Sequence, residues 1–176
     1  SRLDRDYESS LKSLESISMK IDIAQTTYKP IETRLGQIHQ LIGNNDRAKQ
    51  YFTKSRSILE IALKNMPNDA RIYADYGLVL AYLGETQDAV KAGEMAGSLI
   101  PIEKDAIIGA IHYNTLTKIL CIVGEHNRAI ENIISLLSIP SGIHLEELKR
   151  DPVWDPLRNI PRFQALLAKE NNKVST

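Results

Sequence analysis

Apolar residues recur along the chain at intervals of three and four, and three such runs stop at a glycine. The runs are Leu35, Ile38 and Ile42; Tyr76, Leu80 and Leu83; and Leu116, Leu120 and Val123. The glycines that follow them are Gly43, Gly84 and Gly124. This spacing places side chains on one face of an α-helix, and a glycine just past the last apolar turn is typical of a left-handed C-terminal cap. Each run therefore predicts an amphipathic helix that ends at its glycine.

A second helix is predicted after each glycine. The glycines are 41 and 40 residues apart, and Ala48, Ala89 and Ala129 keep the same spacing. We expect Asn45, Thr86 and Asn127 to accept hydrogen bonds from the first free amides of these second helices. An alanine near the start of the second helix lets two backbones approach closely, so the repeated unit is predicted to be a helix hairpin.

This pattern resembles the tetratricopeptide-repeat family, in which aromatic, small and apolar residues recur at fixed positions of a helix pair. The middle repeat carries most of the resemblance: Tyr73, Tyr76, Gly77, Leu80, Gly84, Ala89 and Pro101. The chain departs from the pattern at Glu32, Gly93 and Thr117, where the family has an aromatic residue, a phenylalanine and a small glycine. The resemblance implies an all-α fold: a tetratricopeptide-like α-solenoid of antiparallel helix hairpins with a C-terminal helical capping segment.

The repeats divide the chain into successive segments. We expect a half-repeat at 5–23, full repeats at 24–67, 68–103 and 104–140, a capping segment at 141–171 and a tail at 172–176. These repeats exceed the family's 34 residues. The surplus predicts a long helix at about 46–65 and another at about 104–123. The half-repeat reads as a second helix without its first, so we expect further repeats or another domain before Ser1 in the intact protein.

Near the C-terminus three prolines fall among large apolar residues. Asp151 precedes Pro152 and Asp155 precedes Pro156, so each aspartate is placed to cap a turn that a proline begins. Pro161 is expected to open a last helix, after a new helix that begins at Ser141 or Gly142. Trp154, Leu157 and Phe163 are expected to cover the open face of the third hairpin.

The phrase from Asp151 to Leu167 also resembles a tail that follows the last repeat in many bacterial multidomain signalling proteins. Those proteins join the repeats to an adenylate-cyclase, protein-kinase or winged-helix domain. The matching residues are Asp151, Pro152, Asp155, Pro156, Leu157, Arg158, Pro161, Arg162, Phe163, Leu166 and Leu167. The resemblance implies that this chain is the C-terminal part of a larger signalling or transcription-regulatory protein. Ile160 stands where the tail usually has an aspartate.

Composition narrows the possible functions. The 22 basic and 22 acidic residues give a formal net charge of zero, which argues against nucleic acid as a partner. No apolar run approaches the roughly eighteen residues that span a bilayer, so we expect no membrane insertion in this segment. A cytoplasmic location is expected, with a periplasmic one left open.

Candidate chemistry is sparse. The single cysteine, Cys121, lies in an apolar run without a second cysteine, and is expected to be a buried small residue. The four histidines show no metal-ligand spacing, and His39 is expected in the core. The chain contains no phosphate-binding loop, dinucleotide fingerprint or nucleophile elbow. We therefore expect no enzymatic activity, no cofactor and no metal site.

The remaining candidate is the concave face that the first helix of each repeat offers in such an array. Its predicted partner-binding residues are Gln37, Gln40, Arg71, Asp75, Leu78, Tyr82, Asn114 and Lys118. The expected function is a non-enzymatic scaffold or regulatory module that binds a protein or peptide partner. Two alternatives stay open: a structural spacer that forms homo-oligomers, and a small-ligand sensor that regulates an upstream enzyme domain.

Overall fold

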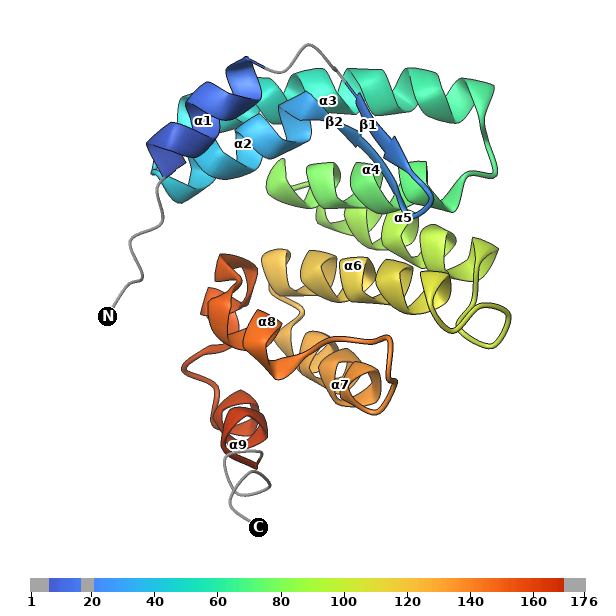
Figure 1. Ribbon diagram of the computed structural model, residues 1–176, viewed down its shortest axis with the longest axis vertical. Helices are drawn as coiled ribbons and strands as arrows, with labels where there is room; N and C mark the ends of the chain where they lie inside the picture. Colours follow the sequence, from blue (N-terminus) through green and yellow to red (C-terminus); the bar gives the residue numbers. More distant parts are fainter. Residues whose placement is uncertain (1–6, 17–20, 170–176) are drawn as a thin grey trace.

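The computed structural model describes residues 7–16 and 21–169, and most of this part of the chain is helical, as predicted (Figure 1). Its elements are α1 (Tyr7–Glu15), β1 (Ile21–Ala24), β2 (Thr27–Pro30), α2 (Ile31–Leu41), α3 (Asn45–Asn65), α4 (Ala70–Tyr82), α5 (Thr86–Leu99), α6 (Ile108–Ile122), α7 (His126–Leu137), α8 (Leu145–Arg150), the 3-10 helix η1 (Pro152–Leu157) and α9 (Pro161–Lys169). The predicted tail at 172–176 lies outside the described residues.

The helices from α2 to α7 pack in sequential pairs. α2 lies on α3, α4 on α5 and α6 on α7, while α3 also contacts α4 and α5 contacts α6. α4 and α6 contact each other directly, so the first helices of the second and third pairs are neighbours. The predicted helix hairpins are therefore present, and each one packs on the next.

Each predicted glycine cap is confirmed. Gly43, Gly84 and Gly124 have φ values of 79°, 82° and 87°, the left-handed region that an L side chain rarely adopts. In the first of these turns the Gly43 N–H donates to the Gln40 carbonyl and the Asn44 N–H to the His39 carbonyl. The same two bonds recur at the other two glycines, so each first helix ends in a Schellman motif that satisfies its last carbonyls.

The predicted N-terminal caps are wrong. The cap of α3 is Asn44 rather than Asn45, and its Oδ1 accepts from the Arg47 N–H at 3.5 Å. Thr86 and Asn127 lie inside the first turns of α5 and α7, whose capping residues Glu85 and Glu125 make no side-chain cap bond. The residue directly after each glycine is the cap, so the next helix begins one position earlier than expected for α3 and α5 and two positions earlier for α7.

Small residues lie where paired helices approach most closely. Ala48, Ala89 and Ala129 are buried, as predicted. A Cβ at Gly77 would lie 2.9 Å from the Ala89 carbonyl oxygen, and one at Gly36 would lie 2.6 Å from the Phe52 ring. In the third pair Thr117 is buried at the corresponding position, and its hydroxyl donates to the Tyr113 carbonyl within α6.

A β-hairpin at residues 21–30 departs from the all-helical prediction. The expected half-repeat at 5–23 is helical over α1 and changes to strand at Ile21, and the expected first repeat from residue 24 begins on this hairpin. α3 has 21 residues and α2 has 11, so α2 covers roughly half of α3. The hairpin covers part of the remainder, because Tyr28 and Ile21 join a core cluster with Leu59 and Ala62 of α3.

The predicted long helix at 104–123 is shorter at its start. Residues 101–107 form turns, and α6 begins at Ile108, where Asp105 Oδ1 accepts from the Ile107 and Ile108 N–H groups at 3.0 and 2.8 Å. Asp105 therefore supplies the start signal for α6, four residues later than expected.

The C-terminal segment folds mostly as the prolines predict. Asp151 Oδ1 accepts from the Val153 N–H at 3.0 Å and caps η1. Asp155 does not cap a turn, since its Oδ1 accepts from Arg158 Nε at 2.7 Å and Pro156 lies inside η1. α8 begins at Leu145 rather than at Ser141 or Gly142. Pro161 opens α9 as expected.

The core has two parts. One cluster joins α3, α4 and the hairpin, and the larger one joins α4, α5, α6, α7 and the C-terminal segment. Trp154, Leu157 and Phe163 are fully buried in the larger cluster. They therefore cover the apolar face of the third hairpin.

Candidate functional site

A groove of about 1200 Å³ runs across α2, α4 and α6, and α1, the β1–β2 hairpin and η1 border it. Its lining includes seven of the eight predicted partner-binding residues: Gln37, Gln40, Arg71, Asp75, Leu78, Tyr82 and Lys118. The eighth, Asn114, is outside that lining, and its Nδ2 donates to Glu147 Oε1 at 3.2 Å. The first helices of the three pairs thus contribute to one continuous surface.

The middle of the groove is apolar. Leu78 is buried, and the Tyr82 ring stacks on Phe52 with centroids 4.6 Å apart and planes 3° from parallel. Burial raises the pKa of Tyr82 to about 12, so its hydroxyl stays protonated at neutral pH. Tyr82 therefore presents the groove with a fixed aromatic surface and a neutral hydroxyl.

A buried carboxylate lies next to this apolar surface. The Thr33 hydroxyl donates to Asp75 Oδ2 at 2.8 Å and lies 2.7 Å from the Ser55 hydroxyl, while Lys29 Nζ lies 3.3 Å from Asp75 Oδ1. Burial raises the pKa of Asp75, and Lys29 and Thr33 only partly offset this effect. The network joins β2, α2, α3 and α4, so Asp75 supports the groove's shape as well as lining it.

Arg71 joins the start of α4 to the tip of the hairpin. Its Nε and Nη2 donate to Asp69 Oδ1 and Oδ2 at 2.9 and 2.6 Å, and its Nη1 donates to the Ala24 carbonyl at 2.8 Å. The hydrogen bonds that Arg71 donates to the Asp69 carboxylate raise the pKa of Arg71 further. Three of its donor groups are therefore engaged within the chain.

Lys118 joins α6 to the C-terminal segment. Its Nζ lies 2.9 Å from Glu147 Oε1 and 3.0 Å from Asp151 Oδ2, and 5.9 Å from the centroid of the Trp154 ring. Burial lowers the pKa of Lys118, but the attraction of Asp151 and Glu147 outweighs burial and raises it overall. The predicted binding residue is therefore an internal ion-pair centre that faces the groove.

The charges on the groove wall are balanced inside the chain. Lys29 pairs with Asp75, Arg34 with Asp22, Arg71 with Asp69, and Lys118 with Glu147 and Asp151. The groove thus presents hydroxyls, amides and apolar side chains beside cations that already have partners.

Sequence reasoning missed the hairpin and η1 as walls of the groove. The residues concerned are Thr26, Thr27, Tyr28, Lys29, Asp151, Pro152, Val153 and Pro156. Alternation of apolar and polar residues at Ile21, Asp22 and Ile23 was the available signal for the hairpin.

His112 also lines the groove, is buried, and has no hydrogen-bond partner among the described residues. Burial lowers its pKa.

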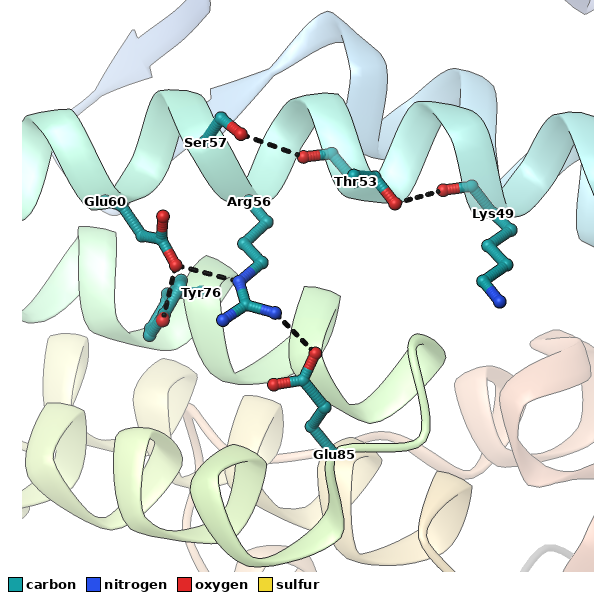
Figure 2. A network of polar contacts seen from close by, with 7 residues as sticks. All are labelled: Lys49, Thr53, Arg56, Ser57, Glu60, Tyr76 and Glu85. Atoms are coloured by element: carbon teal, nitrogen blue, oxygen red, sulfur yellow. Dashed lines mark hydrogen bonds and ion pairs between the residues drawn. The ribbon is translucent and has the colours of Figure 1, made fainter.

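A second polar network lies outside the groove and ties α3 to the second hairpin. Figure 2 shows Arg56 of α3, whose Nε donates to Glu60 Oε1 at 2.8 Å and whose Nη1 donates to Glu85 Oε1 at 2.6 Å. The Tyr76 hydroxyl of α4 donates to the same Glu60 oxygen at 3.2 Å. This network connects adjacent helix pairs, and none of its residues is part of the groove lining.

Reactive chemistry is weak in the described part of the chain. The Cys121 thiol is buried and donates to the Val153 carbonyl at 3.1 Å, and burial raises its pKa to about 12. Within residues 7–16 and 21–169 no group of three or more His, Cys, Asp or Glu side chains is placed to hold a metal ion. His39 is buried and stacks on Tyr51, as expected for a core residue.

No described helix combines the length and apolar character needed to cross a bilayer. No family model, no curated protein and no solved structure matches the chain. The groove is therefore the feature of the chain that indicates a function.

Proposed function

We propose that the chain is a tetratricopeptide-like helical array that binds a peptide or protein segment in the groove across α2, α4 and α6. The observation that carries the proposal is the continuous groove, to which all three first helices contribute. The sequence repeat supports the same reading, because stacked helix hairpins create an extended concave surface.

The size of the groove favours a peptide over a small molecule. Small-molecule pockets span roughly 300–1000 Å³, whereas this groove measures about 1200 Å³. Its apolar middle at Leu78 and Tyr82 suits burial of an apolar side chain. Gln37, Gln40 and Thr115 offer hydrogen bonds to a main chain.

The pairing of charges on the groove wall determines which interactions can supply the binding energy of a peptide. Since each cation on the wall has a carboxylate partner within the chain, we expect apolar burial and neutral hydrogen bonds to supply most of the binding energy. Binding should therefore weaken by less than about threefold between low and physiological salt, because screening acts mainly on unpaired charges.

A peptide selection followed by calorimetry tests the proposal. Peptides are selected from a random display library on the folded chain, and their affinities are measured for the native protein, Thr115→Arg and Thr53→Arg. Thr115 lines the groove, and its hydroxyl donates to the carbonyl four residues earlier. Thr53 makes the same bond on α3 (Figure 2), but it is exposed and is not among the residues that line the groove. It is thus a matched control.

We expect Thr115→Arg to weaken binding by at least about tenfold, because the longer side chain occupies the groove. Thr53→Arg should leave the affinity unchanged. Peptides that bind Thr115→Arg as tightly as the native chain would exclude the groove as the site. Self-association in sedimentation with no peptide binding would instead favour the spacer function.

The C-terminal segment indicates the kind of larger protein in which the array would bind its partner. Its Asp-Pro phrases resemble the tail of bacterial multidomain signalling proteins, and η1 forms part of the groove wall. We propose that the array serves as a regulatory module of a larger bacterial signalling or transcription protein. The gene sequence upstream of the codon for Ser1 tests this: a cyclase, kinase or winged-helix domain is expected there.

A further inference from the structure

We propose that the groove binds its occupant only while the imidazole of His112 is neutral, so that acidification releases the bound segment. This inference rests on the proposed function and adds a mode of regulation to it. The observation behind it is a buried titratable side chain in the groove wall that has no hydrogen-bond partner in the described part of the chain.

His112 lies in the second turn of α6, a helix that packs on α4. The residue is 1% exposed, and it lines the groove together with Ile111 and Thr115 of the same helix. Neither ring nitrogen has a hydrogen-bond partner among the described residues. A neutral imidazole leaves one N–H without an acceptor here, whereas an imidazolium would leave two N–H groups and a positive charge unpaired. The surroundings of His112 therefore disfavour its charged form.

Two charges at the start of α4 act on the ring, and they oppose each other. Burial has the largest effect and lowers the pKa of His112 below its ordinary value of about 6.5. Asp69 raises this pKa and Arg71 lowers it. Both carboxylate oxygens of Asp69 already accept hydrogen bonds from the Arg71 side chain. Asp69 is therefore committed to Arg71 and does not serve as a partner for an imidazolium.

The other elements that pack on α6 are α5, α7 and η1, and in residues 7–16 and 21–169 they contribute no charge that acts on the ring. The charged side chains of α5 and α7 are exposed: Asp88, Lys91, Glu94, Arg128 and Glu131. Lys118 of α6 pairs with Glu147 and with Asp151, the cap of η1. Asp75 is a second buried titratable group of the groove wall, and it pairs with Lys29.

Occupation of the groove should disfavour the imidazolium further. A bound segment displaces water from the groove wall, and its apolar part beside Leu78 and Tyr82 cannot solvate a charge. A protonated His112 would then be a covered cation close to the Arg71 guanidinium. Binding and protonation therefore oppose each other, and each reduces the equilibrium constant of the other by the same factor.

The direction of the pH effect follows from this linkage. The affinity is full above the pKa of His112 in the free chain, and that pKa lies below about 6.5. As the pH falls through it, the affinity should decrease by up to about tenfold per pH unit. Burial raises the pKa of Asp75, so this carboxyl can titrate in the same range. The test must therefore compare chains that differ only at His112.

The test uses capped peptides that are selected on the groove at pH 7.5 and contain no aspartate, glutamate or histidine. Calorimetry measures their affinities at pH 7.5 and pH 5.0 for the native chain, His112→Phe and His144→Gln. Phenylalanine keeps an aromatic ring but cannot take up a proton. Between the two pH values the native chain should lose at least about threefold more affinity than His112→Phe. His144 is exposed and does not line the groove, so His144→Gln should behave like the native chain.

A second measurement needs no substitution at His112. The ring proton between the two nitrogens is followed by nuclear magnetic resonance as the native chain is titrated, first free and then saturated with peptide. The midpoint should be lower in the complex, because the bound segment favours the neutral ring. This readout remains decisive if circular dichroism shows that His112→Phe does not fold.

Three outcomes would overturn the proposal. One is an equal midpoint for His112 in the free and the bound chain, and another is an equal loss of affinity in the native chain and His112→Phe. The third is an acidic peptide that binds the native chain, but not His112→Phe, more tightly at pH 5.0, because the ring would then pair with a carboxylate of the occupant. Failure to select any peptide would reject the proposed function together with this inference, whereas peptides with a pH-independent affinity would reject the regulation alone.

Discussion

At the scale of single residues, Gly84 and Gly97 differ in backbone conformation and not in the space around them. A Cβ at either position meets no atom within 4 Å, but Gly84 has a φ of +82° and Gly97 lies within α5. Gly84→Ala should destabilise the fold by about 1 kcal/mol, because the left-handed conformation is strained for alanine. Gly97→Ala should stabilise it by about 0.5–1 kcal/mol through helix propensity. Urea denaturation of both variants measures the difference.

The essential result of that comparison is that the two variants change the free energy of unfolding in opposite directions. The two variants add the same methyl group without contacts, so each serves as the control for the other. Equal free energies of unfolding for Gly84→Ala and the native chain would show that the Schellman turn adapts to a side chain.

Trp154 is the largest fully buried side chain, and Trp154→Ala should destabilise the fold by about 3–5 kcal/mol. The ring packs within the larger core cluster, and Lys118 lies over its face. The indole Nε1 has no hydrogen-bond partner among the described residues. Trp154→Phe should therefore lose much less stability than the alanine variant. An alanine variant that melts like the native chain would contradict the role of Trp154 in the core.

At the scale of elements, helix ends were predictable wherever a single residue determines the backbone. Gly43, Gly84 and Gly124 mark their helix ends because few other residues tolerate positive φ. Helix starts were less predictable, since several polar residues near Asn44 and Asn45 compete to be the cap. The turn after Ala24 carries no sequence signal, because no described residue other than glycine has positive φ, and the hairpin turns with recognisable sequences require it.

The residues of the candidate site were likewise predictable only where local sequence determines their positions. Helical periodicity placed Gln37, Leu78 and Tyr82 on one surface, and the groove includes them. Periodicity could not show that Lys118 would be held by Glu147 and Asp151, which are 29 and 33 residues away in the sequence. Contacts between distant elements depend on how the C-terminal segment folds back, and local spacing carries no information about that.

Asp75 connects four elements, and its charge should make stability depend on pH. Burial raises the pKa of Asp75 in the folded chain above its unfolded value of about 3.9. The folded state therefore favours the protonated form. The favourable contribution is full below the unfolded pKa and is lost as pH rises through the folded pKa. Asp75→Asn cannot ionise, so it should melt a few degrees higher than the native chain at pH 8 and nearly equally at pH 3.5.

Thermal melts at both pH values measure this effect. Asp88→Asn is the control, because Asp88 is 67% exposed on α5 and should give the same melting temperature as the native chain at both pH values. If Asp75→Asn instead melted below the native chain at pH 8, the ion pair with Lys29 would outweigh the cost of burying the carboxylate.

At the scale of the whole molecule, the two core clusters raise the question of whether the chain unfolds as one unit. The N-terminal cluster includes Phe52 and Leu59 of α3, and the larger one includes Trp154 and Cys121. Arrays of stacked repeats gain stability mainly from neighbouring contacts, so their ends can open separately. The single cysteine offers a direct measurement, because any thiol label reports on one position.

Labelling of Cys121 by a disulfide reagent should require opening of η1. The thiol donates to the Val153 carbonyl, and burial raises its pKa to about 12, so the folded chain holds almost no thiolate at pH 8. We expect labelling at least about 100-fold slower than in the urea-unfolded chain. Trp154→Ala should accelerate it by about 100-fold or more, as a loss of 3–5 kcal/mol implies.

Leu59→Ala, which creates a cavity in the N-terminal cluster, should leave the labelling rate nearly unchanged. Equal acceleration by Leu59→Ala and Trp154→Ala would show that the clusters open together, and that the C-terminal segment does not move independently of the N-terminal cluster.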